Sequence, residues 1–151
     1  MLRITKQTDY GIVLMTQFAS EGPGSLLTAR DLARRAGLPL PTVSKILKAL
    51  ARGALLLSHR GVHGGYSLAR SPDRISVAEI VETLEGPIAI TECLDEATSD
   101  CGIERLCPVR TNWRRINEAV YAALTGIPLA EMAATISFSD LIARKKAKAI
   151  L

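Results

Sequence analysis

Two short amphipathic helices separated by only three residues constrain the fold of this chain most. The stretch TARDLARRAG has the Thr28–Asp31 spacing of a capping box and ends at Gly37, a residue typical of the position after a helix. After the break LPL, the stretch PTVSKILKALARG begins with Pro41, which suits a first helical turn, and stops at Gly53. Two helices joined by so tight a turn predict a helix-turn-helix, although any αα-hairpin of an all-helical core has the same outline.

The second of these helices carries small hydroxyls and amines outside its apolar stripe. Val43, Ile46, Leu47 and Leu50 recur at helical spacing and predict the buried face. In a recognition helix, the residues near the N-terminus meet base edges and phosphates. We therefore predict DNA contacts from this unit at Thr28, Pro41, Thr42, Ser44, Lys45, Lys48 and Arg52.

After the second helix the pattern changes from helix to strand. ALLLSHR, the turn GVHGG and YSLAR predict a β-hairpin over about residues 55–69. Arg60 and His63 lie at its glycine-rich tip, where the backbone can take positive φ or approach a ligand closely. A basic hairpin directly after a helix-turn-helix is typical of a wing, so both tip residues join the predicted DNA contacts.

Positive charge is concentrated in this part of the chain. From Arg30 to Arg74, nine Lys or Arg residues stand against two aspartates, a balance of +7, whereas residues 87–151 carry eight charges of each sign. Such a segment is the footprint of a phosphate-backbone partner, or else a solvated basic surface. Together with the helix-turn-helix and the wing, it predicts double-stranded DNA as the partner.

Helices are also predicted on both sides of this unit. Residues 6–20 predict a helix capped by Thr8 or Asp9, and SVAEIVETLEG predicts another whose capping box is Ser76 with Glu79.

A longer helix is predicted from Pro108 to Gly126. Its apolar residues recur at spacings of four, three, four and four, which is nearly a coiled-coil seam. Because the helix follows a complete winged domain, we expect its stripe to form a homodimer interface, with packing inside the same subunit as the alternative. The stripe consists of Val109, Trp113, Ile116, Val120 and Leu124.

All three cysteines lie in one acidic, turn-rich loop, ECLDEATSDCGIERLCP. The apolar runs are far short of a membrane span and nothing resembles a secretory signal, so we expect a cytoplasmic protein. In that compartment, clustered thiols are more often metal ligands or redox groups than structural disulfides. Soft thiolates suit iron–sulfur clusters or zinc, but the gaps of seven and five residues between these cysteines are wider than those of short zinc loops.

These motifs together resemble a known family. TDYG, GLPLPTVSKILKAL, HRGVHGGYSLA, ISVAEIVETLEGPI and then the three-cysteine loop resemble the IscR/NsrR-type winged-helix regulators, the Rrf-two family, over most of the chain. The sequence around LPLPTVSK, EGPIAITEC and NWRRIN looks nearest to the branch that regulates the SUF iron–sulfur assembly operon. The resemblance implies a homodimer with an iron–sulfur cluster in each cysteine loop, whose state sets DNA affinity or sequence preference.

The resemblance also implies a ligand set. Cys93, Cys101 and Cys107 would hold a two-iron or a four-iron cluster. Some members have a histidine three residues after the last cysteine, where this chain has Arg110, and NsrR-type members use an aspartate of the TDYG stretch, which is Asp9 here. Asp9, from its own or the partner subunit, is therefore the expected fourth ligand. The alternatives in the loop are Glu92, Asp100 and Glu104.

We therefore expect a mainly α fold with a small β-hairpin, in three parts. These are a winged helix-turn-helix domain (1–86), a cysteine cluster-binding loop (87–107), and a dimerisation helix with the C-terminal tail (108–151). The expected function is that of a dimeric DNA-binding transcriptional regulator, set by an iron–sulfur cluster, that controls iron–sulfur assembly (SUF) genes, as a repressor or an activator. We expect no enzymatic activity, no small-molecule substrate and no membrane partner. Two alternatives stay open: a nitric-oxide or redox-sensing repressor, and a cluster-free thiol/disulfide switch.

Overall fold

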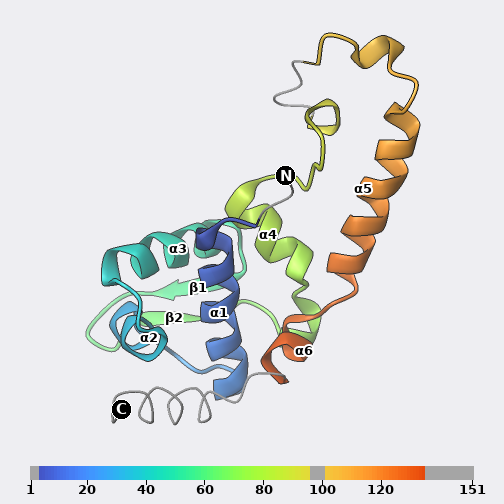
Figure 1. The fold of residues 1–151 in the computed structure, drawn as a ribbon. Helices are drawn as coiled ribbons and strands as arrows, with labels where there is room; N and C mark the ends of the chain where they lie inside the picture. The colour runs from blue at the N-terminus through green and yellow to red at the C-terminus, as the bar shows by residue number, and fades with distance from the viewer. Residues whose placement is uncertain (1–3, 96–100, 135–151) are drawn as a thin grey trace, which may run out of the picture.

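The structure, a computed structural model, describes residues 4–95 and 101–134 (Figure 1). Within them lies a single antiparallel hairpin among helices, as the sequence predicts. The elements in chain order are α1 (Lys6–Glu21), α2 (Ala29–Ala36), α3 (Leu40–Arg52), β1 (Leu56–His59), β2 (Gly65–Leu68), η1 (Pro72–Arg74), α4 (Val77–Glu85), η2 (Glu92–Leu94), η3 (Glu104–Leu106), α5 (Arg110–Thr125) and α6 (Leu129–Ala134).

The predicted helix-turn-helix is confirmed as α2 and α3. The Thr28 hydroxyl accepts a hydrogen bond of 3.1 Å from the Asp31 amide and caps α2. Gly37 follows α2 in the left-handed region at φ 66°, which glycine adopts without steric cost, and turns the chain into α3.

Helices α1, α3 and α4 form the core of the winged unit. Leu14 and Phe18 of α1, Leu50 of α3 and Ile80 of α4 are at most 1% exposed. A Cβ atom at Gly11 would lie 2.3 Å from the Cδ1 atom of Leu84, so glycine at this position lets α1 pack closely against α4.

The start of α1 differs from the sequence prediction. Neither Thr8 nor Asp9 is the N-cap; Thr5 is, and its hydroxyl accepts a hydrogen bond of 3.3 Å from the Thr8 amide. The Thr5 amide in turn donates to the Glu85 carboxylate at 2.7 Å. This tertiary contact with the end of α4 fixes where the helix begins, and it leaves Asp9 exposed in the first turn.

Helix α6 was not predicted, and it returns to the winged unit. Leu129 is fully buried in the core, and its amide donates a hydrogen bond of 2.7 Å to the Ile75 carbonyl. The Val77 amide donates to the Ile127 carbonyl at 3.0 Å. Residues beyond the predicted boundary at 108 therefore complete the core of the winged helix-turn-helix domain. The division into three parts stays a proposal about what each part does.

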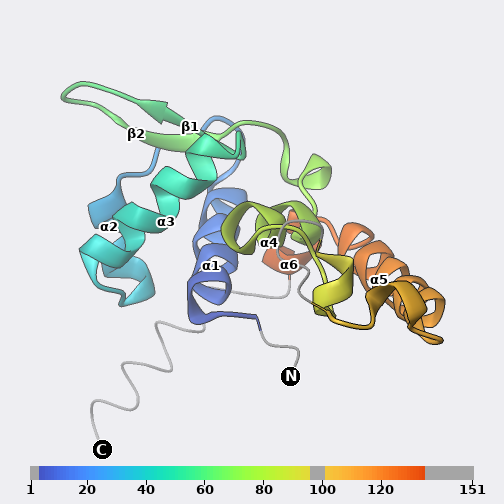
Figure 2. The same ribbon diagram turned by 90° about the horizontal axis from the view of Figure 1, so that it is seen from above.

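The elements separate two surfaces. Helices α2 and α3 and the β1–β2 hairpin lie on one side of α1, and the long α5 stands on the other side beyond α4 (Figures 1 and 2). The loop that carries the three cysteines, with the short turns η2 and η3, lies between the end of α4 and the start of α5 (Figure 1). No helix in the described ranges is both long and apolar enough to cross a lipid bilayer.

Candidate DNA-binding face and cysteine loop

Helix α3 presents its basic side chains to solvent. Lys45, Lys48 and Arg52 are exposed, and so is Pro41 at the start of the helix. The predicted apolar stripe faces the opposite way, and each of its four residues is fully buried. Thr42 and Ser44 are half-buried beside the basic residues. The predicted α3 contacts therefore form one accessible surface.

Thr28 has a structural task besides its predicted DNA contact. Its hydroxyl donates a hydrogen bond of 2.6 Å to the Asp31 carboxylate while it caps α2. This hydrogen bond, with the nearby charges of Arg34 and Arg35, lowers the pKa of Asp31 despite partial desolvation. The Thr28 hydroxyl is thus committed to the start of α2.

The wing is held to the helix-turn-helix and projects beyond it. The Leu27 amide donates to the Tyr66 carbonyl at 2.9 Å, and the Tyr66 amide donates back at 2.8 Å. Arg60 and His63 are exposed at the tip, as predicted, and Figure 2 shows the hairpin extending past α3. Val62 lies between them and is 99% exposed, but the sequence analysis did not include it among the predicted contacts. Its position as a lone apolar residue in a basic glycine-rich turn could have marked it.

The three cysteines are free thiols on short turns of one loop. Cys93 lies in η2, whereas Cys101 and Cys107 flank η3, and all three are half-buried. The Thr91 hydroxyl lies 3.3 Å from the Cys93 sulfur, within hydrogen-bonding distance.

The donor types suit a soft metal centre, but the described subunit does not gather them. Three unbridged thiols in one loop are the donors that iron–sulfur clusters and zinc prefer. In residues 4–95 and 101–134, however, no group of three or more His, Cys, Asp or Glu side chains lies close enough to hold a metal ion. Asp9 is exposed on α1, Glu104 forms an ion pair with Arg110, and Asp100 lies outside the described residues.

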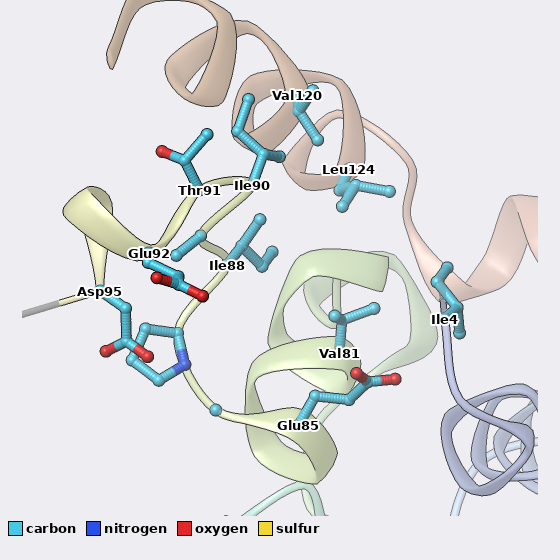
Figure 3. Close-up of a pocket in the computed structure, with 13 residues that line it drawn as sticks. Ile4, Val81, Glu85, Ile88, Ile90, Thr91, Glu92, Asp95, Val120 and Leu124 are labelled. Carbon is cyan, nitrogen blue, oxygen red and sulfur yellow. The ribbon is translucent and has the colours of Figure 1, made fainter. Parts of the chain in front are cut away.

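A cavity of about 500 Å³ separates the cysteine loop from the winged unit (Figure 3). Apolar side chains from α4, α5 and the segment before Cys93 line it, and the acidic residues Glu85, Glu92 and Asp95 lie around it. Partial burial raises the pKa of Glu85, but hydrogen bonds from Thr5 and Thr8 outweigh this and leave the pKa below its usual value.

This cavity divides the predicted dimer stripe. Val120 and Leu124 line it and are half-buried within their own subunit, which is the packing alternative (Figure 3). Val109, Trp113 and Ile116 remain 45%, 39% and 46% exposed. Only the first half of the stripe is therefore free for a second copy, because the winged unit does not reach that far along α5.

A basic helix beside a basic hairpin, both supported by a three-helix core, defines a DNA-binding protein of the winged-helix class. The chain belongs to the Rrf2 family, described as iron-dependent transcriptional regulators, whose model matches residues 4–135. The family resemblance seen in the sequence is thereby confirmed. The protein is a DNA-binding transcriptional regulator and not an enzyme.

Individual relatives agree with this assignment. The chain is 30% identical over 131 residues to the protein rrf2 of Nitratidesulfovibrio vulgaris, covering 87% of each chain. It is 30% identical over 142 residues to the transcriptional regulator CymR of Bacillus subtilis, covering 92% of this chain and 93% of CymR. Among solved structures, CymR, the global cysteine regulator of B. subtilis, superposes with a TM-score of 0.71 at 28% identity, over 91% of this chain and all of CymR. IscR of T. potens superposes with a TM-score of 0.65 at 26% identity, over 91% of this chain and 90% of IscR.

Proposed function

We propose that this protein is a cytoplasmic, dimeric regulator whose DNA binding is set by an iron–sulfur cluster in the cysteine loop. The observation that carries the proposal is the position of the thiols. All three lie on one loop between the DNA-binding unit and α5, and none is in a disulfide. Membership of a family described as iron-dependent supports the same chemistry. The SUF-type assembly genes are the proposed targets, on the resemblance of the sequence.

The proposed ligands are Cys93, Cys101 and Cys107, with Asp9 as the fourth. Asp9 is available because Thr5, not Asp9, caps α1. Glu104 is a poorer candidate because it is already paired with Arg110. Asp9 lies on α1, outside the cysteine loop, so it is proposed to come from the same subunit or from a partner subunit. A cluster bound there would supply a centre that oxidants or nitric oxide attack and that is lost when iron or sulfur is scarce.

A shift of the cysteine loop is proposed to reach the DNA-binding face through contacts of α4. The segment before Cys93 forms one wall of the cavity whose other walls include Val81 and Glu85 of α4. Glu85 holds the start of α1 through the Thr5 amide, and α1 and α4 pack with α3. A shift of the cysteine loop is therefore proposed to reach the recognition helix through this packing.

A cluster-free thiol switch is the second candidate. Two observations favour it: the described residues do not gather a metal-binding group, and the chain is similar to CymR, the global cysteine regulator of B. subtilis. In this version, two of the three cysteines form a disulfide on oxidation and change the shape of the dimer.

Anaerobic purification distinguishes the two candidates. The cluster proposal predicts coloured protein with visible absorption and with iron and sulfide bound in equal amounts, and Cys→Ala at any of the three positions should abolish the colour. Circular dichroism should remain that of a folded protein, because the loop lies outside the buried core. Colourless protein after iron and sulfide reconstitution, together with a two-thiol loss on oxidation that alters DNA affinity, would establish the thiol switch instead.

A further inference from the structure

We propose that Arg110 and Asn117 of α5 are positioning residues that each hold one arm of the cysteine loop. Arg110 holds the arm that carries Cys101 and Cys107, and Asn117 holds the arm that leads to Cys93. The inference deepens the proposed function by assigning how the thiols are placed, and its test uses apo protein so that the outcome does not depend on a cluster.

Asn117 fixes the backbone just before Cys93. Its side-chain amide donates a hydrogen bond of 2.9 Å to the Ile88 carbonyl, and its side-chain carbonyl accepts one of 3.0 Å from the Ile90 amide. One side chain thus satisfies a donor and an acceptor of an extended segment, as a neighbouring strand would. Thr91 follows immediately, and its hydroxyl reaches the Cys93 sulfur at 3.3 Å. Asn117 therefore holds the segment from which Cys93 is presented.

The second arm is fixed by two turns that are tied together. The Glu104 amide donates to the Cys101 carbonyl at 3.0 Å, and the Arg110 amide donates to the Cys107 carbonyl at 3.4 Å. The side chains of the same two residues, Glu104 and Arg110, form an ion pair of 2.6 Å. Each turn begins at a cysteine and ends at one member of the pair, so the ion pair sets the position of Cys101 relative to Cys107.

Both holding residues belong to the same face of α5. They are seven residues apart, which is close to two full helical turns, so their side chains leave the helix in nearly the same direction. The Nε atom of Arg110 is buried, while the side chain as a whole is half-exposed, so only part of the guanidinium lies against the loop. Helix α5 therefore contacts both arms of the loop through these two side chains.

The test is the alkylation rate of each cysteine in reduced apo protein, measured with iodoacetamide and peptide mass spectrometry. Asn117→Ala should raise the Cys93 rate about threefold to tenfold, because losing both half-buried hydrogen bonds increases local opening. The rates of Cys101 and Cys107 should not change. Asn117→Asp keeps the acceptor for Ile90 but sets a carboxylate oxygen against the Ile88 carbonyl, so it should raise the Cys93 rate as well.

The other arm gives the reciprocal pattern. Glu104→Gln and Arg110→Gln should each raise the Cys101 and Cys107 rates about twofold to fivefold, the effect of one half-exposed ion pair, and leave Cys93 unchanged. Exchanging the two charges in the double variant Glu104→Arg/Arg110→Glu should restore the wild-type rates. Arg105→Gln, which removes a neighbouring exposed charge, is the matched control and should change no rate.

Three results would overturn the proposal. The first is a uniform rise of all three rates in any variant, which would indicate general unfolding of the loop. The second is a rate that falls in Arg110→Gln and rises in Glu104→Gln, which would indicate a direct charge effect on the thiolates. The third is failure of the charge exchange to restore the rates. Thermal melts of each variant confirm that the winged unit stays folded during the measurement.

Discussion

Glu79 joins the start of α4 to the segment after β2 through one carboxylate. It accepts a hydrogen bond of 2.9 Å from the Ser76 amide in the capping box of α4, and it pairs with Arg70 at 2.7 Å. Partial burial raises its pKa, but the hydrogen bonds from Ser76 and Arg70 together with the Arg70 charge lower it further, so the net pKa is below the usual value. The folded protein therefore binds a proton at Glu79 less readily than the unfolded chain does.

The lowered pKa of Glu79 makes the stability of the fold depend on pH, with a sign that can be stated. The stabilisation from Glu79 is present above the ordinary glutamate pKa of about 4.3 and is lost as the pH falls through the lowered value. Glu79→Gln should lower the free energy of unfolding at pH 6 by less than about 1 kcal/mol, since the pair is half-exposed. The difference in unfolding free energy between this variant and the wild type, measured with denaturant, should disappear in acid. Glu82→Gln is the control. A difference that stays constant into acid would contradict this assignment.

Asp9 tests how the loop is coupled to the DNA-binding unit. A carboxylate is a harder and weaker partner for cluster iron than a thiolate, so Asp9→Ala should leave a cluster that forms but is more labile and spectroscopically shifted. Because Asp9 lies on α1, which packs with α3, the variant should weaken the difference between apo and holo DNA binding more than binding itself. If Asp9→Ala keeps the wild-type cluster spectrum and the full difference between apo and holo DNA binding, Asp9 is not the fourth ligand. Glu92, Asp100 or Glu104 would then be the better candidate.

At the scale of elements, the wing is expected to contact the DNA backbone. Arg60 is exposed at its tip, and each phosphate contact that is removed should reduce the slope of log affinity against log salt by about 0.9. Arg60→Ala should therefore bind a specific operator more weakly and with a shallower slope. Arg114 lies on α5, which stands on the other side of α1 from the hairpin in Figure 1, so Arg114→Ala should keep the wild-type slope. If Arg60→Ala preserves both affinity and slope, the wing assignment is wrong.

Helix α5 is expected to form the dimer through the exposed first half of its stripe. Ile116→Glu would bury a charge against the partner helix at a cost of several kcal/mol, and sedimentation should then show monomer. Because Ile116 is 46% exposed in the single subunit, the variant should keep its fold by circular dichroism. Thr111→Glu, an exposed position on the opposite side of the helix, should remain dimeric. A dimeric Ile116→Glu protein would place the interface elsewhere.

The elements that local patterns define were predicted well from the sequence. The N-caps at Thr28 and Ser76 were found because each lies three residues before its acidic partner, and at Ser76 the full capping box forms. The cap of α1 was assigned wrongly, since Thr5 is fixed by Glu85, 80 residues further along the chain. Helix α6 was missed for the same reason, because its burial depends on backbone contacts with residues near Ile75.

The same distinction applies to the candidate site. The thiols and the basic side chains are visible as residue types in the sequence. The role of Asn117 is not, because Asn117 contacts the backbone of Ile88 and Ile90, and backbone contacts leave no mark on residue identity. The division of the α5 stripe was also hidden, since periodicity shows which residues share a face but not how far the neighbouring unit extends.

In the whole molecule, the DNA-binding face and the cysteine loop lie on different sides of the α1–α4 packing (Figure 1). The cavity beside α4 lies between the loop and that packing, and α5 carries both the loop attachments and the exposed half-stripe. Loop state, subunit contact and recognition-helix position are therefore expected to be linked. This linkage is the central claim about how the protein regulates transcription.

Operator binding by apo and reconstituted protein, measured anaerobically on the same promoter fragment at one salt concentration, tests that claim most directly. The account predicts coloured holo protein whose affinity or sequence preference differs clearly from that of apo protein. It also predicts that the Cys93→Ala, Cys101→Ala and Cys107→Ala variants all behave as the apo form. Reconstituted protein that carries a full complement of iron and sulfide but binds every operator as the apo protein does would contradict it.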